Sequence, residues 1–187
     1  MDIQEVIQKV IIEDGIKQEF TQTLSSRVER YLKVKQHIII PATKFAPVSM
    51  ECARIFRDGH FYGAIALSQA VAEAIVKFLC EKNGWKPKKN FEENIATLET
   101  RQFITKNIKE KFLLLWNRRD DYHHLNPTIE TNRQKLESLA YDKLFLLNEI
   151  ESELFKFSYV DGRLTPENPK YWTIQSDGIM PVFLRGE

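Results

Sequence analysis

The residues best suited to chemistry lie together in one segment, residues 116–127. It reads Trp-Asn-Arg-Arg-Asp-Asp-Tyr-His-His-Leu-Asn-Pro and holds two of the four histidines of the 187-residue chain. Arginine is permanently cationic and binds phosphate through paired hydrogen bonds, whereas histidine gains or loses a proton near neutral pH. The candidate catalytic residues are therefore Arg119 and His124, with Asp120 beside the arginine to orient or polarise one of them.

An arginine and a histidine placed at one phosphodiester of RNA suffice for cleavage without a metal. The 2′-hydroxyl is the nucleophile, histidine moves the protons, and arginine stabilises the charge that develops at the phosphorus. No cluster of acidic residues with metal-ligand spacing accompanies the segment. The pattern therefore requires neither a metal nor another cofactor.

The segment resembles a known family. Arg119, a polar residue, three more residues and then His124 fit the signature of the HEPN superfamily, the higher eukaryotes and prokaryotes nucleotide-binding domains. The resemblance covers roughly residues 20–157 by helix order. It implies an all-α bundle of four or more helices and a symmetric homodimer that pairs two motifs in one cleft.

The resemblance also implies an activity. Many HEPN members are metal-independent ribonucleases of toxin–antitoxin, phage-defence or CRISPR-associated systems. For this chain that implies an RNA substrate, and a cognate antitoxin or a nucleotidyltransferase as a further partner. The alternative is a non-catalytic helical module that serves as an interaction or nucleotide-binding subunit. This alternative is favoured by the nearly neutral net charge and by the scarcity of basic residues on the surface.

Two registers of the arginine–histidine pair are open. Arg118 with His123 has the same spacing as Arg119 with His124, but only Arg119 is followed by a polar, non-arginine residue. Residues five apart on a regular helix point about 140° apart. A shared role thus requires a local distortion, a helix end or a second protomer. A purely structural role is also open, in which the arginines pair with nearby acids and the histidines lie at a helix C-terminus.

Several residues are candidates for supporting roles. Those within or beside the motif are Arg118, Tyr122 and His123, and those on the apolar helix expected over residues 61–79 are Ser68 and Glu73. A basic linker follows that helix and contains Lys86, Lys88 and Lys89. Its simplest interpretation is a solvated loop, and its functional one is contact with an RNA backbone.

Composition limits the class of protein. The chain has 27 basic and 26 acidic residues, so no global field attracts it to nucleic acid or a membrane. Seven glycines, seven prolines and 43% hydrophobic residues favour ordered helices. Cys52 and Cys80 lie among apolar residues at helical spacing, which predicts buried free thiols. The sequence shows no signal peptide and no long apolar run, so we expect a cytoplasmic protein without a membrane span.

The apolar spacing predicts a mainly α, single-domain bundle over residues 1–187, with its core over about 20–157. Helices are expected over residues 3–15, 21–32, 47–56, 61–79, 91–98, 103–116 and 132–154. His37–Pro41 is either an extended connector or the end of a helix. Residues 158–187 are expected to form a small β hairpin and an irregular strap, with Asp161-Gly162 as the hairpin turn. Tyr171 and Trp172 of that strap are expected to pack on the helices.

Overall fold

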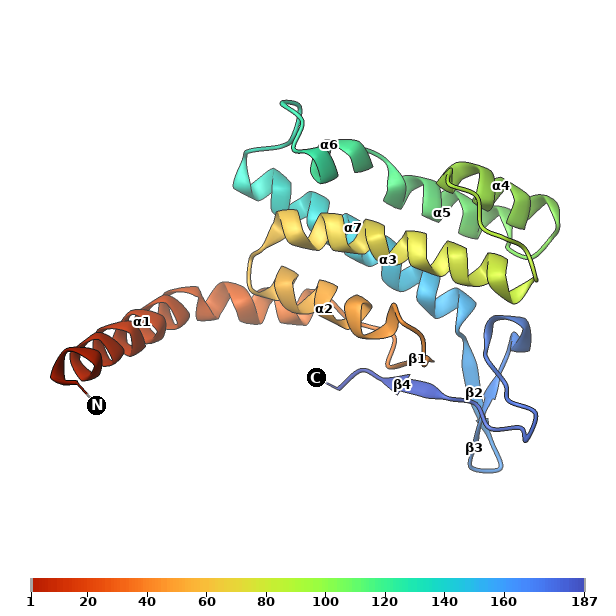
Figure 1. Cartoon of the computed structure of the whole chain (residues 1–187), viewed down its shortest axis with the longest axis horizontal. Coiled ribbons are helices and arrows are strands. Elements are labelled where there is room, and N and C mark those ends of the chain that lie inside the picture. Colours follow the sequence, from red (N-terminus) through yellow and green to blue (C-terminus); the bar gives the residue numbers. More distant parts are fainter. Residues whose placement is uncertain (1, 187) are drawn as a thin grey trace. The chain divides into compact units, whose positions relative to one another are not determined.

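The computed structural model describes residues 2–186, and the chain divides into two compact units that separate between Lys33 and Val34. The N-terminal unit is a single helix, α1 (Ile3–Lys33), drawn in red in Figure 1. Two helices separated near Gly15 were expected, and that prediction is wrong. A glycine inside a helix costs about 1 kcal/mol relative to alanine but removes no hydrogen bond, so a helix can continue through it. Residues 20–33, which were expected in the bundle core, belong to α1.

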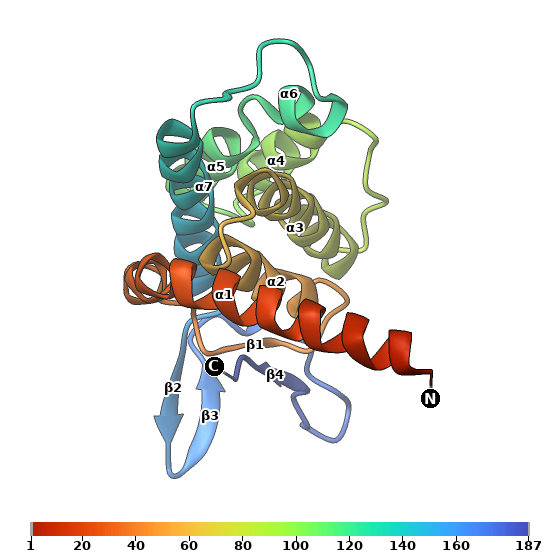
Figure 2. The ribbon, with the colours of Figure 1, turned by 90° about the vertical axis from the view of Figure 1, so that its left-hand side faces the viewer.

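The C-terminal unit is a helical bundle organised around α3 (Phe61–Lys82). The helices around it are α2 (Ala46–Arg57), α4 (Phe91–Thr100), α5 (Lys106–Trp116), α6 (Arg119–His124) and α7 (Arg133–Leu154). All five contact α3, and Figure 2 shows α3 lying among them. The structure thus confirms a mainly α bundle with a small β appendage.

Local sequence signals set the ends of these helices. The side chains of Asn90, Thr105 and Asn132 accept hydrogen bonds from backbone N–H groups of α4, α5 and α7, respectively. Gly59 and Gly84 follow α2 and α3 in the left-handed conformation, with φ of 84° and 69°. Glycine adopts this conformation without a steric penalty, so both helices stop where the sequence predicts.

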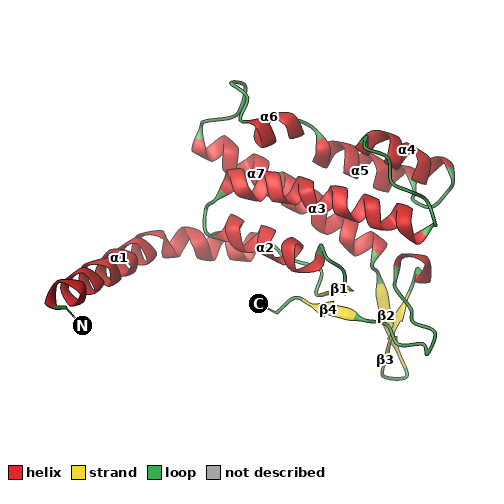
Figure 3. Ribbon diagram, in the orientation of Figure 1, coloured by secondary structure: helices red, strands yellow, loops and turns green. Residues whose placement is uncertain are grey.

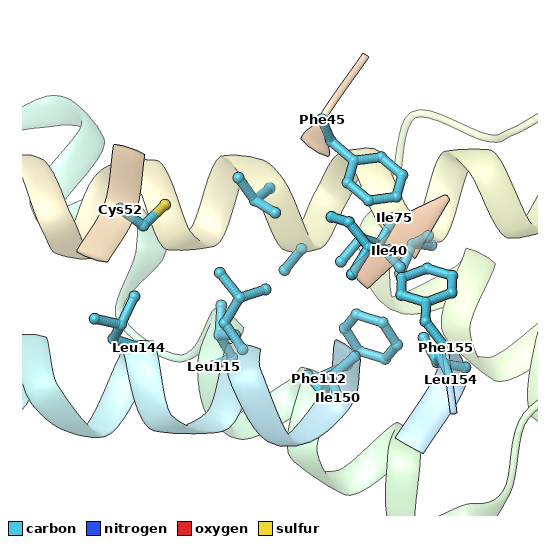
Figure 4. Close-up of a cluster of buried hydrophobic side chains, with 14 of the residues drawn as sticks. Ile40, Phe45, Cys52, Ile75, Phe112, Leu115, Leu144, Ile150, Leu154 and Phe155 are labelled. Carbon is cyan, nitrogen blue, oxygen red and sulfur yellow. The ribbon is translucent and has the colours of Figure 1, made fainter. Parts of the chain in front are cut away.

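Apolar side chains from α2, α3, α5 and α7 fill the centre of the bundle. Figure 4 shows Ile75 of α3, Phe112 of α5 and Ile150 of α7 among them. Cys52 and Cys80 are buried free thiols, as predicted, and burial raises the pKa of Cys52 to about 12. Within the part of the chain that is described, only α3 is long and apolar enough to cross a membrane. Of its most apolar stretch, 56% is buried against the protein, as in a core helix.

Short strands, in yellow in Figure 3, lie beside the helices, and Ile39 and Ile40 of the first strand are buried in the core. β1 (Ile39–Pro41) pairs antiparallel with β4 (Val182–Leu184), with Ile39 opposite Leu184. The segment His37–Pro41, which was open between two interpretations, is therefore an extended connector whose last three residues form β1. β2 (Phe157–Val160) and β3 (Arg163–Pro166) form the predicted hairpin. Its turn residues Asp161 and Gly162 both have positive φ, 51° and 75°, as a tight hairpin turn requires.

The strap after the hairpin packs on the helices, as predicted. It contains a short 3₁₀ helix, η1 (Pro169–Tyr171), followed by Trp172. Tyr171 and Trp172 are buried. The Tyr171 hydroxyl donates to the carbonyl of Phe103 at 2.6 Å, and Lys82 donates to the carbonyl of Trp172 at 2.7 Å.

A buried ion pair joins the end of the chain to the bundle. Arg185 donates through Nη2 to Oε1 of Glu151 at 2.7 Å, and both side chains are almost wholly inaccessible. The same nitrogen donates to the Ser49 hydroxyl at 2.7 Å, and Nη1 donates to the His37 carbonyl at 3.2 Å. α2, α7 and the two strands beside them are thereby linked through one guanidinium.

Candidate active site

The motif lies on α6, a short helix flanked by two strained residues. Arg118 precedes it with φ of 62°, and Leu125 follows it with φ of 52°. A residue with a side chain in this left-handed conformation costs about 1–2 kcal/mol. Such strain persists only where the surroundings fix the backbone. α6 is therefore a separate, well-defined turn of helix and not a frayed continuation of α5.

Two buried polar side chains hold the end of α5, from which α6 departs. Gln69 of α3 donates through Nε2 to the carbonyls of Leu115 at 3.2 Å and Asn117 at 3.3 Å. Lys143 of α7 donates to the carbonyls of Leu114 at 2.6 Å and Asn117 at 2.9 Å. These bonds satisfy carbonyls that a helix C-terminus leaves without partners. Burial, followed by the charge of Arg118, lowers the pKa of Lys143 to about 8.

Neither Gln69 nor Lys143 was singled out from the sequence, although a signal was present. Lys143 lies seven residues after Leu136 and directly before Leu144, on the apolar stripe of α7, where a lysine is unusual. Gln69 likewise interrupts the apolar face of α3. A polar residue on a buried stripe indicates a partner that needs its hydrogen bonds.

Arg118 is committed to holding the loop that follows α6. Its Nε donates to Oδ2 of Asp121 at 2.8 Å, and its Nη2 donates to the carbonyl of Thr128 at 2.6 Å. The Thr128 hydroxyl in turn donates to Oδ1 of Asp121 at 2.8 Å. The bond from Arg118, then that from Thr128, lowers the pKa of Asp121. We call Arg118, Asp121 and Thr128 the loop cluster.

Arg119 makes fewer hydrogen bonds than Arg118. Its guanidinium lies over the ring of Trp116, 5.1 Å from the centroid, and Nη1 donates to Oδ1 of Asp120 at 3.1 Å. Asp120 is 75% exposed, so this pair is weak in water. Arg119 is itself partly exposed, and its Nε is buried without a hydrogen-bond partner among residues 2–186. Arg118 is the more exposed of the two arginines, 39% against 30%, but Arg119 is the one with fewer hydrogen bonds to the rest of the chain.

The two histidines differ in the same way. His123 is partly buried, and its ring lies close to the backbone of Ala66 on α3. Burial, and next the nearby charge of Arg119, lowers the pKa of His123. Its Nε2 is buried and has no partner within the described chain. His124 is exposed. The ring of His123 is therefore held inside the protein as the neutral form, while that of His124 is accessible to a substrate.

Tyr122 lies beneath the motif as part of the core. It is 4% exposed, and its ring is 6.3 Å from that of Tyr62 on α3, whose hydroxyl donates to the carbonyl of Glu130 at 2.9 Å. The guanidinium of Arg118 lies 5.7 Å from the centroid of the same ring. Tyr122 thus anchors α6 on α3 and does not face solvent.

The structure brings only one of the two α3 candidates towards the motif. Glu73 is close enough to His123 to raise its pKa, and it also pairs with Lys77 at 2.6 Å. Ser68 lies in the core, where its hydroxyl donates to the carbonyl of Ala64 at 2.7 Å and contacts the Cys52 thiol. It is 0% exposed, so it does not face the motif histidines.

The basic linker returns towards the motif through an aromatic contact. Lys86, Lys88 and Lys89 are exposed, and Lys88 pairs with Glu93 at 3.0 Å. The linker ends at Phe91, whose ring stacks on that of Trp116 with centroids 3.9 Å apart. Trp116 therefore contacts both the end of the linker and Arg119.

A shallow pocket of about 520 Å³ adjoins this aromatic pair. Its lining residues are Glu92, Glu110, Leu113, Leu114, Trp116 and Asn117. Two carboxylates in its wall make it unsuited to a phosphate, and the motif arginines and histidines are not among its lining residues. Across residues 2–186, no group of three or more histidine, cysteine or acidic side chains is placed to hold a metal.

No protein-family model matches this chain, and no curated protein or solved structure matches it either. The indications of function therefore lie in the site itself. The motif supplies one available guanidinium and one exposed imidazole on a rigid turn of helix, with a neutral imidazole behind them. Such a set can bind a phosphate and move a proton.

Proposed function

We propose that the chain is a metal-independent endoribonuclease of the HEPN type, with Arg119 and His124 as its catalytic residues. The observation that carries this proposal is the difference in contacts and exposure among the four motif residues. Arg118 donates two hydrogen bonds to the loop after α6 and His123 is partly buried, whereas Arg119 has only one weak, exposed ion pair and His124 is exposed. This difference supports the register in which Arg119 binds the scissile phosphate.

In the proposed reaction, the RNA 2′-hydroxyl attacks the adjacent phosphorus and the 5′-oxygen of the next nucleotide leaves. The products are a 2′,3′-cyclic phosphate and a 5′-hydroxyl. His124 accepts the 2′-hydroxyl proton or donates one to the leaving oxygen. Arg119 stabilises the charge of the phosphorane, and Asp120 orients its guanidinium. Exposed Lys88 and Lys89 would contact the RNA backbone beside Trp116.

The two residues are five positions apart on α6, so one copy presents them in different directions. We therefore propose a two-fold dimer in which Arg119 of one copy acts with His124 of the other. Mixing Arg119→Ala chains with His124→Ala chains tests this directly. Mixed dimers would contain one intact pair, and about a quarter of the wild-type cleavage should return after subunit exchange. A mixture that stays inactive, while each variant still dimerises, contradicts the shared site.

Single variants test the chemistry. His124→Ala should lower cleavage of a single-stranded RNA by about 10²–10⁴-fold, and Arg119→Lys should lower it strongly because an ammonium cannot reproduce a bidentate contact. His123→Asn is the matched control and should have a much smaller effect. Cleavage should persist in EDTA, and a DNA of the same sequence should be inert. Activity that survives His124→Ala, or that requires a divalent metal, contradicts the proposal.

A cytoplasmic role in a defence or toxin–antitoxin system, with an antitoxin or a nucleotidyltransferase as a partner, goes with this activity. A non-catalytic binding module remains the second candidate, and the acidic pocket beside Trp116 favours it. RNA binding without cleavage by the wild-type chain would support that alternative.

A further inference from the structure

α1 displays apolar side chains along its whole length. They include Ile3, Ile7 and Leu24, which are 76%, 54% and 44% exposed. Full burial of an aliphatic side chain of this size gives about 1.5–3 kcal/mol, and these partly exposed side chains forgo roughly half of it or more. So long an apolar row on a 31-residue helix indicates a binding surface.

One line of residues along α1 follows the alternating four- and three-residue spacing of a coiled-coil seam. We call it the α1 seam, and its members are Ile3, Ile7, Val10, Asp14, Lys17, Thr21, Leu24 and Val28. This spacing keeps the side chains on one side of the helix. The aliphatic members stand at the two ends, and the two charged members stand at the centre.

We propose that the α1 seam binds the α1 seam of a second copy of this chain in the antiparallel orientation. The alternation of four- and three-residue spacings reads the same from either end of the seam. A two-fold axis between positions 15 and 16 therefore places each seam residue of one copy opposite a seam residue of the other. The facing pairs are then Ile3 with Val28, Ile7 with Leu24, Val10 with Thr21 and Asp14 with Lys17. Each pair occurs twice, as the symmetry of an isologous interface requires.

Charge complementarity selects both this partner and this orientation. Residues 2–14 contain four acidic side chains and one basic one, a net charge of −3. Residues 17–33 contain four basic side chains and two acidic ones, a net charge of +2, and three of the four basic side chains are not buried, Arg30 being the buried one. An antiparallel second copy places each acidic half against a basic half. A parallel copy would place Asp14 against Asp14 and Lys17 against Lys17, with like charges facing each other.

Within one copy, Asp14 and Lys17 pair only weakly. Their charged atoms are 3.6 Å apart, and the side chains are 65% and 71% exposed. Both groups can therefore turn to the second copy at little cost. Two adjacent polar layers in an apolar seam also fix register, because a shift by one heptad leaves Asp14 facing Val10 or Leu24. This pairing does not depend on the proposed ribonuclease activity, since α1 carries none of the motif.

Substitutions on and off the seam test the interface in the full-length chain. Leu24→Asp places a carboxylate in the seam twice and should weaken dimerisation, measured by sedimentation equilibrium, by about 100-fold or more. Ile12→Asp is the matched control, because Ile12 is 61% exposed but lies off the seam. The control should dimerise like the wild type. A wild-type chain that stays monomeric at tens of micromolar, or equal weakening by the two variants, overturns the proposal.

Cross-linking reads out the orientation and distinguishes this interface from any other contact between copies. The double variant Ile7→Cys, Leu24→Cys should form a covalent dimer rapidly on mild oxidation, because the two thiols face each other across the axis. Ile7→Cys alone should not, since the position facing it is a leucine. Efficient cross-linking by Ile7→Cys alone would show parallel helices and overturn the antiparallel register. Either result leaves the RNA-cleavage test of the proposed function unchanged.

Discussion

Lys143 offers a quantitative test of how the end of α5 is held. It is 4% exposed, and burial lowers its pKa from 10.5 to about 8. The unfolded chain restores the higher pKa and so binds the proton more tightly than the folded chain does. The free energy of unfolding therefore rises with pH across the window between about 8 and 10.5. The whole difference corresponds to about 3 kcal/mol, of which about 2 kcal/mol falls between pH 7 and pH 9.5.

Ionisation of Cys52 lowers the free energy of unfolding over the upper part of this pH window. Its pKa is raised from 9.0 to about 12 in the folded chain, so above pH 9 its thiol ionises preferentially in the unfolded chain and stability falls. Comparison with a Lys143→Met chain removes this contribution, because both chains contain the thiol. The unfolding free energy of the wild type, relative to Lys143→Met, should increase by about 2 kcal/mol from pH 7 to pH 9.5.

The assay is urea denaturation followed by far-ultraviolet circular dichroism at several pH values. Lys135→Met is the matched control, because Lys135 is an exposed lysine on the same helix. Its unfolding free energy should run parallel to that of the wild type at every pH. If Lys143→Met also runs parallel to the wild type, then Lys143 is not a desolvated cation and the reasoning about the α5 terminus fails.

Three further predictions concern other contacts. Arg185→Met leaves the Glu151 carboxylate buried without its cation and should cost about 3–5 kcal/mol in urea denaturation, whereas adding Glu151→Leu should recover most of the loss. Trp172→Ala should cost about 3–5 kcal/mol by creating a cavity, and an unchanged melting temperature would show that the strap contributes nothing to stability. Asp121→Asn should speed amide hydrogen exchange over residues 118–128 alone. Because Arg118 lowers the pKa of Asp121, the same loosening should appear in the wild type only as the pH falls below about 4.

The helices that could be predicted are those whose ends carry their own signals. Gly84 ends α3 and Asn132 begins α7 where the sequence indicates, because capping depends on a few adjacent residues. Gly15 was misread as a helix end, since a glycine alone does not distinguish a helix interior from its C-terminus. The pairing of β1 with β4 could not be predicted, because neither short strand shows which other strand it will meet.

The candidate site was predicted as a segment but not as an arrangement. Residue types place the arginines and histidines on one short stretch, yet they do not show which side chains face inwards. Arg118 is fixed by Thr128, and His123 by Ala66, through contacts with residues that carry no motif signal. The same limit applies to Ser68, whose partner Cys52 lies on a different helix.

The ion pair between Arg185 and Glu151 also orders the steps of folding. Arg185 contacts the His37 carbonyl across a sequence separation of 148 residues, so this contact closes one of the longest loops in the protein. Loop-closure entropy makes such a contact late, after the local helices have formed. Until then, the Glu151 carboxylate has no cationic partner, so its burial would cost free energy and it stays hydrated. During synthesis, α2 and α7 should therefore not pack fully against each other until β4 has been synthesised and has paired with β1.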